Sequence, residues 1–556
     1  MYLRLTRHPI RIIFVFYCLF LFIGLDSFPL IDWDENIYGI VSKNMFLNKE
    51  FFRLTINEQL YTEKPPFIFW ITSLSYYLFG IHEFSTRLQA ILSGLVCFYS
   101  IYRFGKKYFS EKVATYWCLL YSSSLIPLFL SRTAYIDHWF NTFLFLSFCS
   151  LYEYHLKKEE SFSIRFPWIL CSSLFIGLAV LTKGPLGLFF PIASYLFMLI
   201  MIKRIQIRWL DVLLGFFIFL LTTSLYYIPN LYLYGSETLK GFYQFQGKLL
   251  SKSLEGHTGP WFYHFLICFI GFFPWTALLI LMIKKSNLVL LFRDSNSHKG
   301  ISYYFGFWML SLLLIFSLVQ TKLPHYSSSI YLGLSFFGAR LLSLKEESND
   351  PSQRKQFYLG TIFVGILISV LFLSLPFVFS YYSSTPNFQK QFGNYPKDAL
   401  GSFAILPGII LIVGVSSALL WIKKDTYSNF LLHIWTTAQL FFVSISLFLA
   451  PCLIPMLQDK NLRLFDIVKE KKGIIAFYKY LSFYPMFYRE DPILIMGNYK
   501  FKDDTIYLSS EKFDSLKKPL YLITTKNKKM ELDFLFPKRT FTIIKEDTDL
   551  LLISVQ

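Results

Sequence analysis

Long apolar runs alternate with short polar segments along almost the whole chain. An apolar run of about 18 residues or more is long enough to cross the ~30 Å hydrocarbon core of a bilayer as an α-helix. Such runs occupy approximately residues 11–30, 85–104, 113–131, 134–154, 167–182, 185–202, 209–229, 262–283, 301–319, 326–343, 357–380, 402–422 and 428–454. The pattern predicts a polytopic α-helical membrane protein with about 13 transmembrane helices.

The polar segments between these runs fall into two alternating groups. Members of one group carry basic pairs, as at Lys106-Lys107, Lys203-Arg204 and Lys284-Lys285. The positive-inside rule places these segments in the cytoplasm, so the other segments and the C-terminal end face the opposite side. The first apolar run lacks a small-residue cleavage site, and we expect it to be a retained span. We therefore predict a multi-pass protein of the cytoplasmic (inner) membrane.

The segment 31–84 is too long and too aromatic for a simple connection between two spans. Residues 35–47 place apolar side chains at roughly helical spacing, and residues 67–79 show the same pattern. Both stretches predict short amphipathic helices that lie in the membrane interface. Pro65 and Pro66 suit a sharp start of the second helix, because proline is favoured at the first helical position.

The last hundred residues have a different character, with more charge and short runs of β-branched and aromatic residues. The runs 493–496, 520–523, 540–544 and 550–553 predict strands, and 462–480 is the best helix candidate. We predict a small extracytoplasmic α/β domain at 456–556, after a transmembrane domain at 1–455.

Composition narrows the class of protein further. Charged residues make up 16% of the 556 residues, against about a quarter in an average soluble domain. The net charge of +18 lies mostly in short loops, so the membrane surface explains it better than nucleic acid does. All seven cysteines lie in or beside apolar runs, where cysteine packs as a small hydrophobe. We expect neither disulfides nor a thiolate metal site.

Three carboxylates come close together at residues 32–35, directly after the first apolar run. One interpretation is a set of ordinary solvated loop charges. The other is an active site, because Trp33 and Tyr38 bracket the acids as interface anchors would, and Glu63 and Lys64 return charge to the same face. We take the segment 31–84 as the active-site loop.

Further polar residues at the same predicted face need an explanation. Asp137 begins a span, and intramembrane carboxylates are costly and usually functional; the alternative is a structural ion pair with Arg132. Lys183 ends a span before Gly184-Pro185, either as a functional cation or as a lysine that extends to the interface. A similar pattern surrounds Pro324, with Lys322 and Tyr326, and His257 lies beside an aromatic belt.

These residues together resemble a known family. The motifs are Asp34-Glu35-x-x-Tyr38, Glu63-Lys64-Pro65-Pro66, Asp137, Thr182-Lys183-Gly184 and Lys322-Leu323-Pro324-x-Tyr326. In this order and spacing they resemble the GT-C glycosyltransferases that use polyprenyl-phosphate sugars, in particular the lipid A aminoarabinose transferases and their protein-mannosyltransferase-like relatives. The resemblance covers essentially the whole chain.

The resemblance implies roles for single residues. Asp34 would be the catalytic acid of the loop, Asp137 a second functional carboxylate, and Lys64 the holder of the donor lipid phosphate. We expect Glu35, Tyr38, Arg132, Lys183, Lys322 and Tyr326 to contact the substrates. Glu63 would be a candidate ligand for a divalent metal, and His257 is a further candidate ligand. One position departs from the aminoarabinose pattern, since Ile37 stands where an arginine is expected. Either Lys183 or Arg132 substitutes for that arginine, or the substrates differ.

The expected activity is sugar transfer from a polyprenyl (undecaprenyl) phosphate to an envelope acceptor such as lipid A, on the outer face of the membrane. The sugar could be an aminopentose such as 4-amino-4-deoxy-arabinose. Alternatives are a protein O-glycosyltransferase acting on Ser/Thr hydroxyls, and a lipid or sugar transporter. No nucleotide-binding motif is present in the sequence, so we expect no nucleotide cofactor and no nucleic acid partner. We expect the protein to act as a monomer among membrane lipids.

Overall fold

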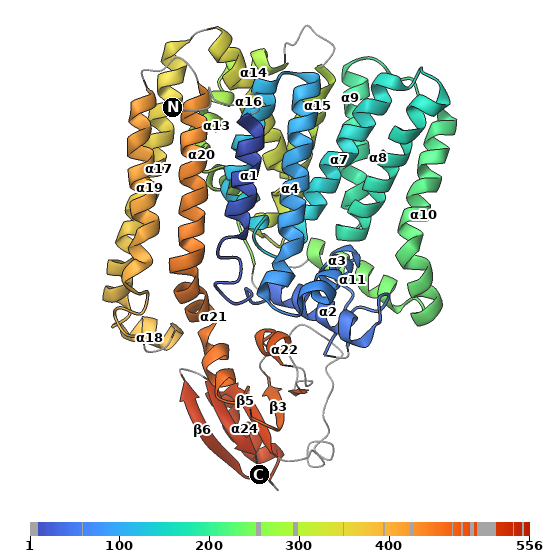
Figure 1. The fold of residues 1–556 in the computed structure, drawn as a ribbon. Helices are drawn as coiled ribbons and strands as arrows, with labels where there is room; N and C mark the ends of the chain where they lie inside the picture. The colour runs from blue at the N-terminus through green and yellow to red at the C-terminus, as the bar shows by residue number, and fades with distance from the viewer. Residues whose placement is uncertain are drawn as a thin grey trace.

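The computed structural model describes residues 9–57, 59–251, 257–292, 299–348, 350–392, 395–422, 427–469, 471–479, 482–489, 494–496, 519–537, 539–547 and 550–555. Within them, a helical bundle carries a small sheet at one end (Figure 1). Of the predicted strand 493–496, residue 493 lies outside the described residues.

The helices follow one another along the chain without long gaps. They are α1 (Pro9–Phe22), α2 (Asp34–Asn48), α3 (Phe67–Phe79), α4 (Glu83–Tyr108), α5 (Glu111–Ser123), α6 (Leu125–Leu130), α7 (Asp137–Lys157), α8 (Phe162–Lys183), α9 (Leu186–Met201), α10 (Trp209–Tyr234), α11 (Glu237–Ser251), α12 (Tyr263–Gly271), α13 (Thr276–Met282), α14 (Lys285–Phe292), α15 (Lys299–Leu318), η1 (Pro324–Ser327), α16 (Ile330–Glu347), α17 (Pro351–Tyr382), α18 (Pro386–Phe392), η2 (Ser402–Ile405), α19 (Leu406–Ser417), η3 (Ala418–Trp421), α20 (Tyr427–Ser444), η4 (Ile445–Leu449), α21 (Ala450–Asp466), α22 (Tyr484–Tyr488), η5 (Lys526–Lys528) and α24 (Lys529–Leu535).

Each predicted span falls on one to three helical elements, and the polytopic helical fold is confirmed. By length and apolar composition, seven helices of the described residues could cross a membrane, or eight if the bent pair α12–α13 counts as one. This pair turns by 118°, so the prediction of one continuous span at 262–283 is wrong. The predicted span 113–131 is likewise divided, into α5 and α6. The number of about 13 spans stays a prediction.

Three tryptophans at the centre of the bundle have hydrogen-bond partners for their indole N–H groups. Trp117, Trp275 and Trp435 are almost fully buried. The indole of Trp117 donates to the Leu332 carbonyl at 3.1 Å, and the other two indoles donate to serine hydroxyls on α5 at 2.9 Å. A buried indole that finds a partner contributes its large apolar surface without leaving an unpaired donor.

The predicted interfacial helices are present as α2 and α3, which lie across the lower end of the bundle (Figure 1). Between them, a short antiparallel pair joins β1 (Thr55–Ile56) to β2 (Gln59–Leu60). Helix α11 lies in the same region, between the predicted spans 209–229 and 262–283, and it was not predicted from the sequence. Its apolar residues Leu239, Phe242 and Phe245 recur every three positions, which is the signal that could have identified it.

The C-terminal sheet has five strands in the order β4-β3-β5-β7-β6. They are β3 (Ile474–Tyr478), β4 (Leu494–Met496), β5 (Leu520–Thr525), β6 (Phe541–Asp547) and β7 (Leu550–Val555). The first three in sheet order are parallel, with Ile474 opposite Leu520, and β5-β7-β6 are antiparallel, with Leu520 opposite Val555. The predicted helix 462–480 is wrong in its second half. Its apolar residues 474–478 form the buried strand β3, because a short apolar run does not distinguish strand from helix.

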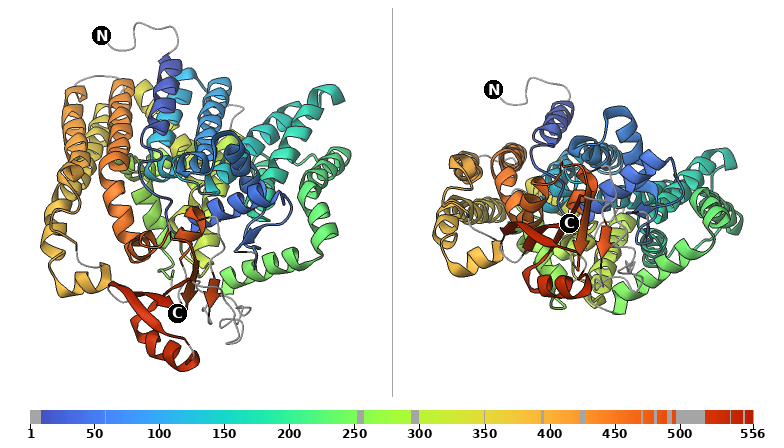
Figure 2. Two further views of the ribbon diagram at one scale, coloured as in Figure 1. Left: turned by 60° about the horizontal axis from the view of Figure 1, so that its bottom comes forward. Right: turned by 90° about the horizontal axis from the view of Figure 1, so that it is seen from below.

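The sheet packs on both faces. One face covers Leu532 and Phe536 of the α24 region, and the other meets Leu464 and Phe465 of α21 together with Ile40 of α2. Viewed from below, the sheet lies beneath the middle of the bundle (Figure 2). Helix α21 runs continuously through the predicted domain boundary at 455/456, and the division itself stays a prediction.

The arrangement makes a prediction about topology. Cysteines placed at Asn48, at the end of α2, and at Asn527, beside the sheet, should both react with a membrane-impermeant maleimide on intact cells. A cysteine at Lys285, at the start of α14 and at the opposite end of the bundle (Figure 1), should react only after permeabilisation. Labelling of Asn48→Cys and Lys285→Cys from the same side would contradict the predicted orientation.

Candidate active site

Two carboxylates and a histidine meet at the lower end of the bundle. His325 Nε2 lies 3.7 Å from Asp34 Oδ2 and 4.0 Å from Asp137 Oδ2. Asp34 comes from the first turn of α2, Asp137 from the first turn of α7 and His325 from η1. The structure therefore brings together the two carboxylates that the sequence singled out, although they are far apart in the chain.

The two carboxylates differ in their surroundings. The Asp137 side chain is 2% exposed and forms an ion pair with Lys183, whose ammonium group also lies over the rings of Phe140 and Tyr326. The Asp34 side chain is 31% exposed. The structural alternative for Asp137, an ion pair with Arg132, is wrong, because its basic partner is Lys183.

Local backbone geometry directs Lys183 to this place. Helix α8 ends at Lys183, and Gly184 follows with φ +86° while its N–H donates to the Val180 carbonyl at 2.8 Å. A Cβ on Gly184 would lie 2.6 Å from the ring of Phe242 on α11. Glycine is therefore required by both the left-handed backbone and the close contact. Pro185 is the N-cap of the next helix, α9, so Lys183 stays at the end of α8.

Tyrosines line the Asp34 side of the site. The Tyr38 hydroxyl donates to Asp34 Oδ1 at 3.3 Å, and the Tyr38 side chain is buried. Burial raises the pKa of Tyr38 well above its usual value, and the Asp34 carboxylate adds to the shift. The hydroxyl thus keeps its proton and remains a donor to Asp34. Tyr326 contributes its ring, which contacts His325 at 5.1 Å between centroids.

His325, the histidine between the carboxylates, was not predicted as a site residue. Its side chain is 12% exposed. Burial lowers the pKa of His325 below its usual value, and the carboxylates of Asp137 and Asp34 oppose this shift. Two serines that follow it in sequence anchor η1, since Ser327 contacts His264 Nδ1 at 2.9 Å and Ser328 accepts from Asn141 at 2.9 Å. No sequence signal separates this histidine from other interfacial histidines.

Lys64 is half-buried at the edge of the cluster, with its ammonium group 5.4 Å from the ring centre of Phe245 on α11. Its charge lies close enough to act on Asp137, Lys183 and His325. Among the described residues, no carboxylate forms an ion pair with Lys64. The site therefore contains one lysine whose charge is balanced by Asp137 and a second, Lys64, whose charge is not.

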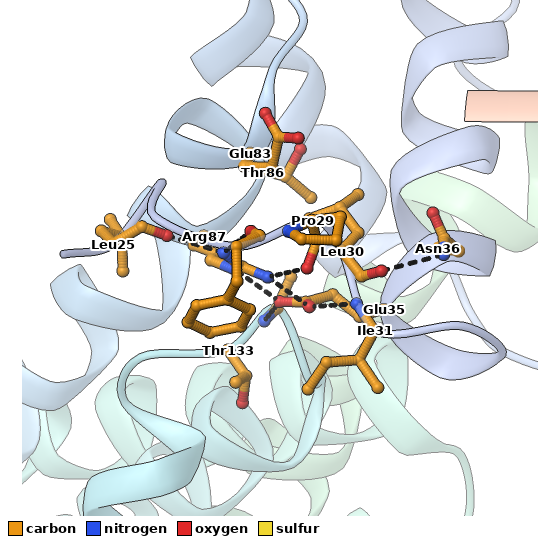
Figure 3. Close-up of polar contacts among 12 residues, drawn as sticks. Leu25, Pro29, Leu30, Ile31, Glu35, Asn36, Glu83, Thr86, Arg87 and Thr133 are labelled. Carbon is orange, nitrogen blue, oxygen red and sulfur yellow. Dashed lines mark hydrogen bonds and ion pairs between the residues drawn. The ribbon is translucent and has the colours of Figure 1, made fainter. Parts of the chain in front are cut away.

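Glu35, next to Asp34, is buried and points toward Arg87 (Figure 3). Its carboxylate forms a two-pronged ion pair with Arg87, with both N–O distances 2.8 Å, and both side chains are fully buried. The backbone N–H groups of Ile31 and Ala134 also donate to it at 2.8 Å. Arg87 in turn donates to the carbonyls of Leu25, Phe28 and Pro29. All of these contacts are internal, so the structure places Glu35 in a buried support beneath the site.

Arg132 and Lys322 also point away from the cluster. The Arg132 guanidinium donates to the carbonyls of Phe20 and Ile23 and to the Ser446 hydroxyl. Lys322 is 6% exposed and donates to the carbonyls of Phe316 and Ser317 at 2.8 and 2.7 Å. It thereby supplies hydrogen-bond donors to the backbone carbonyls in the last turn of α15. Their predicted contacts with substrate stay predictions, and the geometry shows structural roles for both.

The metal prediction rests on Glu63 and His257. His257 is exposed, and its carbonyl accepts from the Lys322 N–H at 2.9 Å. Within the described ranges, no group of three or more His, Cys, Asp or Glu side chains has an arrangement that could hold a metal ion. A metal site formed by these two ligands stays a prediction.

The fold and the cluster define a class: a polytopic helical membrane protein with carboxylates and lysines gathered where interfacial helices cross one end of the bundle. Comparisons with known proteins agree with this class. Residues 63–227, which begin at the Glu63-Lys64 motif, match the family model of the dolichyl-phosphate-mannose-protein mannosyltransferases. The GT-C type fold predicted from the motifs is confirmed.

Individual proteins make the likeness more specific. ArnT from Cupriavidus metallidurans, whose crystal structure has undecaprenyl phosphate bound, superposes with a TM-score of 0.79 at 18% identity, over 99% of this chain and 98% of that one. The undecaprenyl phosphate-α-4-amino-4-deoxy-L-arabinose arabinosyl transferase of Wigglesworthia glossinidia brevipalpis is 27% identical over 372 residues, which are 65% of this chain and 63% of the relative. A protein of Aquifex aeolicus is 25% identical over 67% of this chain and 72% of its own length. The chain thus has the ArnT fold.

Loss of either partner of the buried Glu35–Arg87 ion pair should strongly destabilise the fold. Glu35→Gln or Arg87→Met leaves the other charge buried without its partner, which typically costs about 3–5 kcal/mol. We expect a strongly lowered unfolding temperature and a poor folded yield in detergent. Arg53→Ala is the control, because its contact with Glu50 is exposed and long at 4.0 Å, and such pairs contribute under about 1 kcal/mol. Equal stability of all three variants would contradict the structural role.

Proposed function

We propose that the protein transfers 4-amino-4-deoxy-arabinose, or a closely similar aminopentose, from undecaprenyl phosphate to lipid A at the periplasmic face of the inner membrane. The ArnT fold and the arabinosyl transferase relatives support the donor and the sugar. The observation that carries the proposal is the cluster of Asp34, Asp137, Lys183, His325 and Lys64 at the end of the bundle crossed by interfacial helices.

Lys64 is well placed to bind the phosphate of the donor lipid. When the bond between the sugar and the polyprenyl phosphate breaks, negative charge develops on the departing phosphate, and a preorganised cation lowers the energy of that transition state. Lys64 has no carboxylate ion pair among the described residues, so its charge is available to a ligand. The nearby ring of Phe245 offers an apolar surface for the isoprenoid that adjoins the phosphate.

Lys183 is the better substitute for the missing arginine at position 37. Ile37 itself is buried in an apolar cluster with Val41 and Tyr61, and it cannot contact a phosphate. Arg132 spends its hydrogen bonds on backbone carbonyls, whereas Lys183 lies inside the cluster. We infer that Lys183, held by Asp137, supplies the second positive charge beside the donor.

Asp34 is well placed to act on the acceptor substrate. It is the more exposed carboxylate, and its Oδ1 accepts from Tyr38 while its Oδ2 faces His325. A hydroxyl acceptor has a high pKa and needs a base to remove its proton, whereas a phosphate acceptor is already ionised and needs orientation. Asp34 can serve as the base in the first case, and can orient a substrate amine or hydroxyl in the second.

The family model that matches residues 63–227 describes enzymes acting on proteins, which favours a Ser/Thr hydroxyl as the second candidate acceptor. A transporter remains the alternative of another class, and the glycosyltransferase relatives favour transfer over transport. Incubation of purified protein with undecaprenyl-phosphate aminoarabinose, and either lipid A or a Ser/Thr peptide, decides among these. Sugar on neither acceptor would contradict the proposed function.

Lys64→Ala tests the phosphate contact. Removing one preorganised charge from the developing phosphate should reduce kcat on the order of 10²–10³-fold, while the half-buried side chain contributes little to folding. Lys64→Arg keeps the charge and should retain part of the turnover. Lys240→Ala, which removes an exposed lysine of α11, is the matched control and should behave as wild type. Unchanged transfer by Lys64→Ala would remove Lys64 from the mechanism.

Asp34→Asn separates the two acceptor chemistries. With a hydroxyl acceptor, the loss of the base should lower the rate on the order of 10²–10⁴-fold, and raising the pH should restore part of it. With a phosphate acceptor, the rate should fall without recovery at high pH. The measurement is steady-state transfer in detergent across a pH series, and full activity of Asp34→Asn at every pH would exclude Asp34 from catalysis.

A further inference from the structure

A cavity of about 1080 Å³ opens between α1, α4, α7 and α8. Its walls are the first half of α1, the second halves of α4 and α7, and the first to middle turns of α8, in the upper half of the bundle in Figure 1. The body is apolar and aromatic, with Phe14, Phe98, Leu146 and Phe175. Small-molecule sites usually measure about 300–1,000 Å³, so this space suits an occupant as large as a lipid.

Four cations line the same cavity: Arg11, Arg103, Lys106 and Lys107. Lys106 is paired with Glu111, and Lys107 with Glu153. Arg11 and Arg103 are exposed, and neither has an ion pair with a carboxylate in the described part of the chain. The cavity thus combines an apolar body with two arginines that can donate several hydrogen bonds to a phosphate.

The aromatic residues around the opening mark the depth of a membrane interface. Trp168 lies beneath the ammonium groups of Lys157 and Lys107, at 4.5 and 5.9 Å from its ring centre. Tyr99 lines the cavity and is 57% exposed. Tryptophan and tyrosine favour the headgroup level of a bilayer, where one side of the ring is apolar and the other wet.

This cavity is remote from the candidate active site. Asp137 begins α7, and Glu153 in the cavity wall lies sixteen residues later on the same helix. At 1.5 Å per residue the two positions are about 24 Å apart along the axis, which is most of the thickness of a hydrocarbon core. The cavity therefore opens towards the leaflet opposite the one that faces Asp34.

We propose that this cavity binds an anionic glycerophospholipid, with acyl chains along the apolar walls and the phosphate between Arg11 and Arg103. Charge complementarity selects the occupant: the basic segments at this end of the bundle face the leaflet whose surface is anionic in the predicted orientation. The donor polyprenyl phosphate shares the phosphate chemistry, but the proposed transfer reaction uses it at the opposite end. The proposal does not depend on the identity of the transferred sugar.

The test is lipid retention by the purified full-length protein, measured by native mass spectrometry after incubation with phosphatidylglycerol, phosphatidylethanolamine or undecaprenyl phosphate. Wild type should retain phosphatidylglycerol in clear preference to phosphatidylethanolamine. A basic residue near an anionic surface contributes roughly fivefold in binding, so Arg11→Ala/Arg103→Ala should lower phosphatidylglycerol retention on the order of tenfold or more. Lys284→Ala/Lys285→Ala removes two exposed cations from the same end outside the cavity and should leave retention unchanged.

A second variant tests the apolar body. Cys171 is a half-buried residue of the α8 wall, and Cys171→Trp should fill the space and lower retention with both arginines present. A phosphatidylglycerol with a diazirine on an acyl chain should crosslink to peptides of α4 and α8. Three results would each overturn the proposal: equal retention of phosphatidylethanolamine, wild-type retention in both cavity variants, or a stronger effect of Arg11→Ala/Arg103→Ala on undecaprenyl phosphate than on phosphatidylglycerol.

Discussion

The position of the candidate active site depends on the buried ion pair between Glu35 and Arg87. Two charges removed from water are stabilising only when their geometry is good and their remaining lone pairs and protons are satisfied. Here both conditions hold, because Glu35 accepts four hydrogen bonds and Arg87 donates to three carbonyls in addition to the carboxylate. The pair connects the chain at residues 25–35, the start of α4 and the approach to α7. Asp34 precedes Glu35 by one residue, so fixing Glu35 also fixes Asp34 relative to Asp137.

The C-terminal sheet region contributes to the same constraint. Trp33 has φ 70°, a conformation that is costly for a bulky residue and persists only where the surroundings hold it. Its ring contacts Phe483 at 5.3 Å, and Lys43 of α2 donates to the carbonyls that end α22, among them Phe487 at 2.9 Å. The helix that carries Asp34 is therefore held from above by α4 and from below by the α22 segment, which lies between β3 and β4 in the chain.

Much of the fold follows from local pattern, and the sequence was sufficient for it. Apolar length identifies the helices, and helical spacing identifies α2 and α3, because both signals lie within a single element. Which side chains form ion pairs with each other does not follow from local pattern. Asp34 and Glu35 are adjacent and chemically alike, yet one lies at the edge of the cluster and the other is fully buried, and only the position of Arg87 decides which is which. The pairing of Asp137 with Lys183 likewise depends on how α7 and α8 pack, since Arg132 is closer in sequence. The strand β3 was missed because its environment in the sheet, not its sequence period, determines its form.

The two carboxylates of the cluster differ in exposure, and we expect this difference to give them different roles. Asp137, 2% exposed and paired with Lys183, is neutralised by its partner; a buried carboxylate in that state is better suited to holding a cation in place than to accepting a proton. Asp34, 31% exposed, has a tyrosine donor on one oxygen and a histidine 3.7 Å from the other, so it can exchange partners when a substrate arrives. His325 lies within 4.0 Å of both carboxylates. Any proton that moves to Asp34 therefore changes the field at the Asp137–Lys183 pair. In the proposed reaction, this would couple the charge beside the donor to the protonation of the acceptor side.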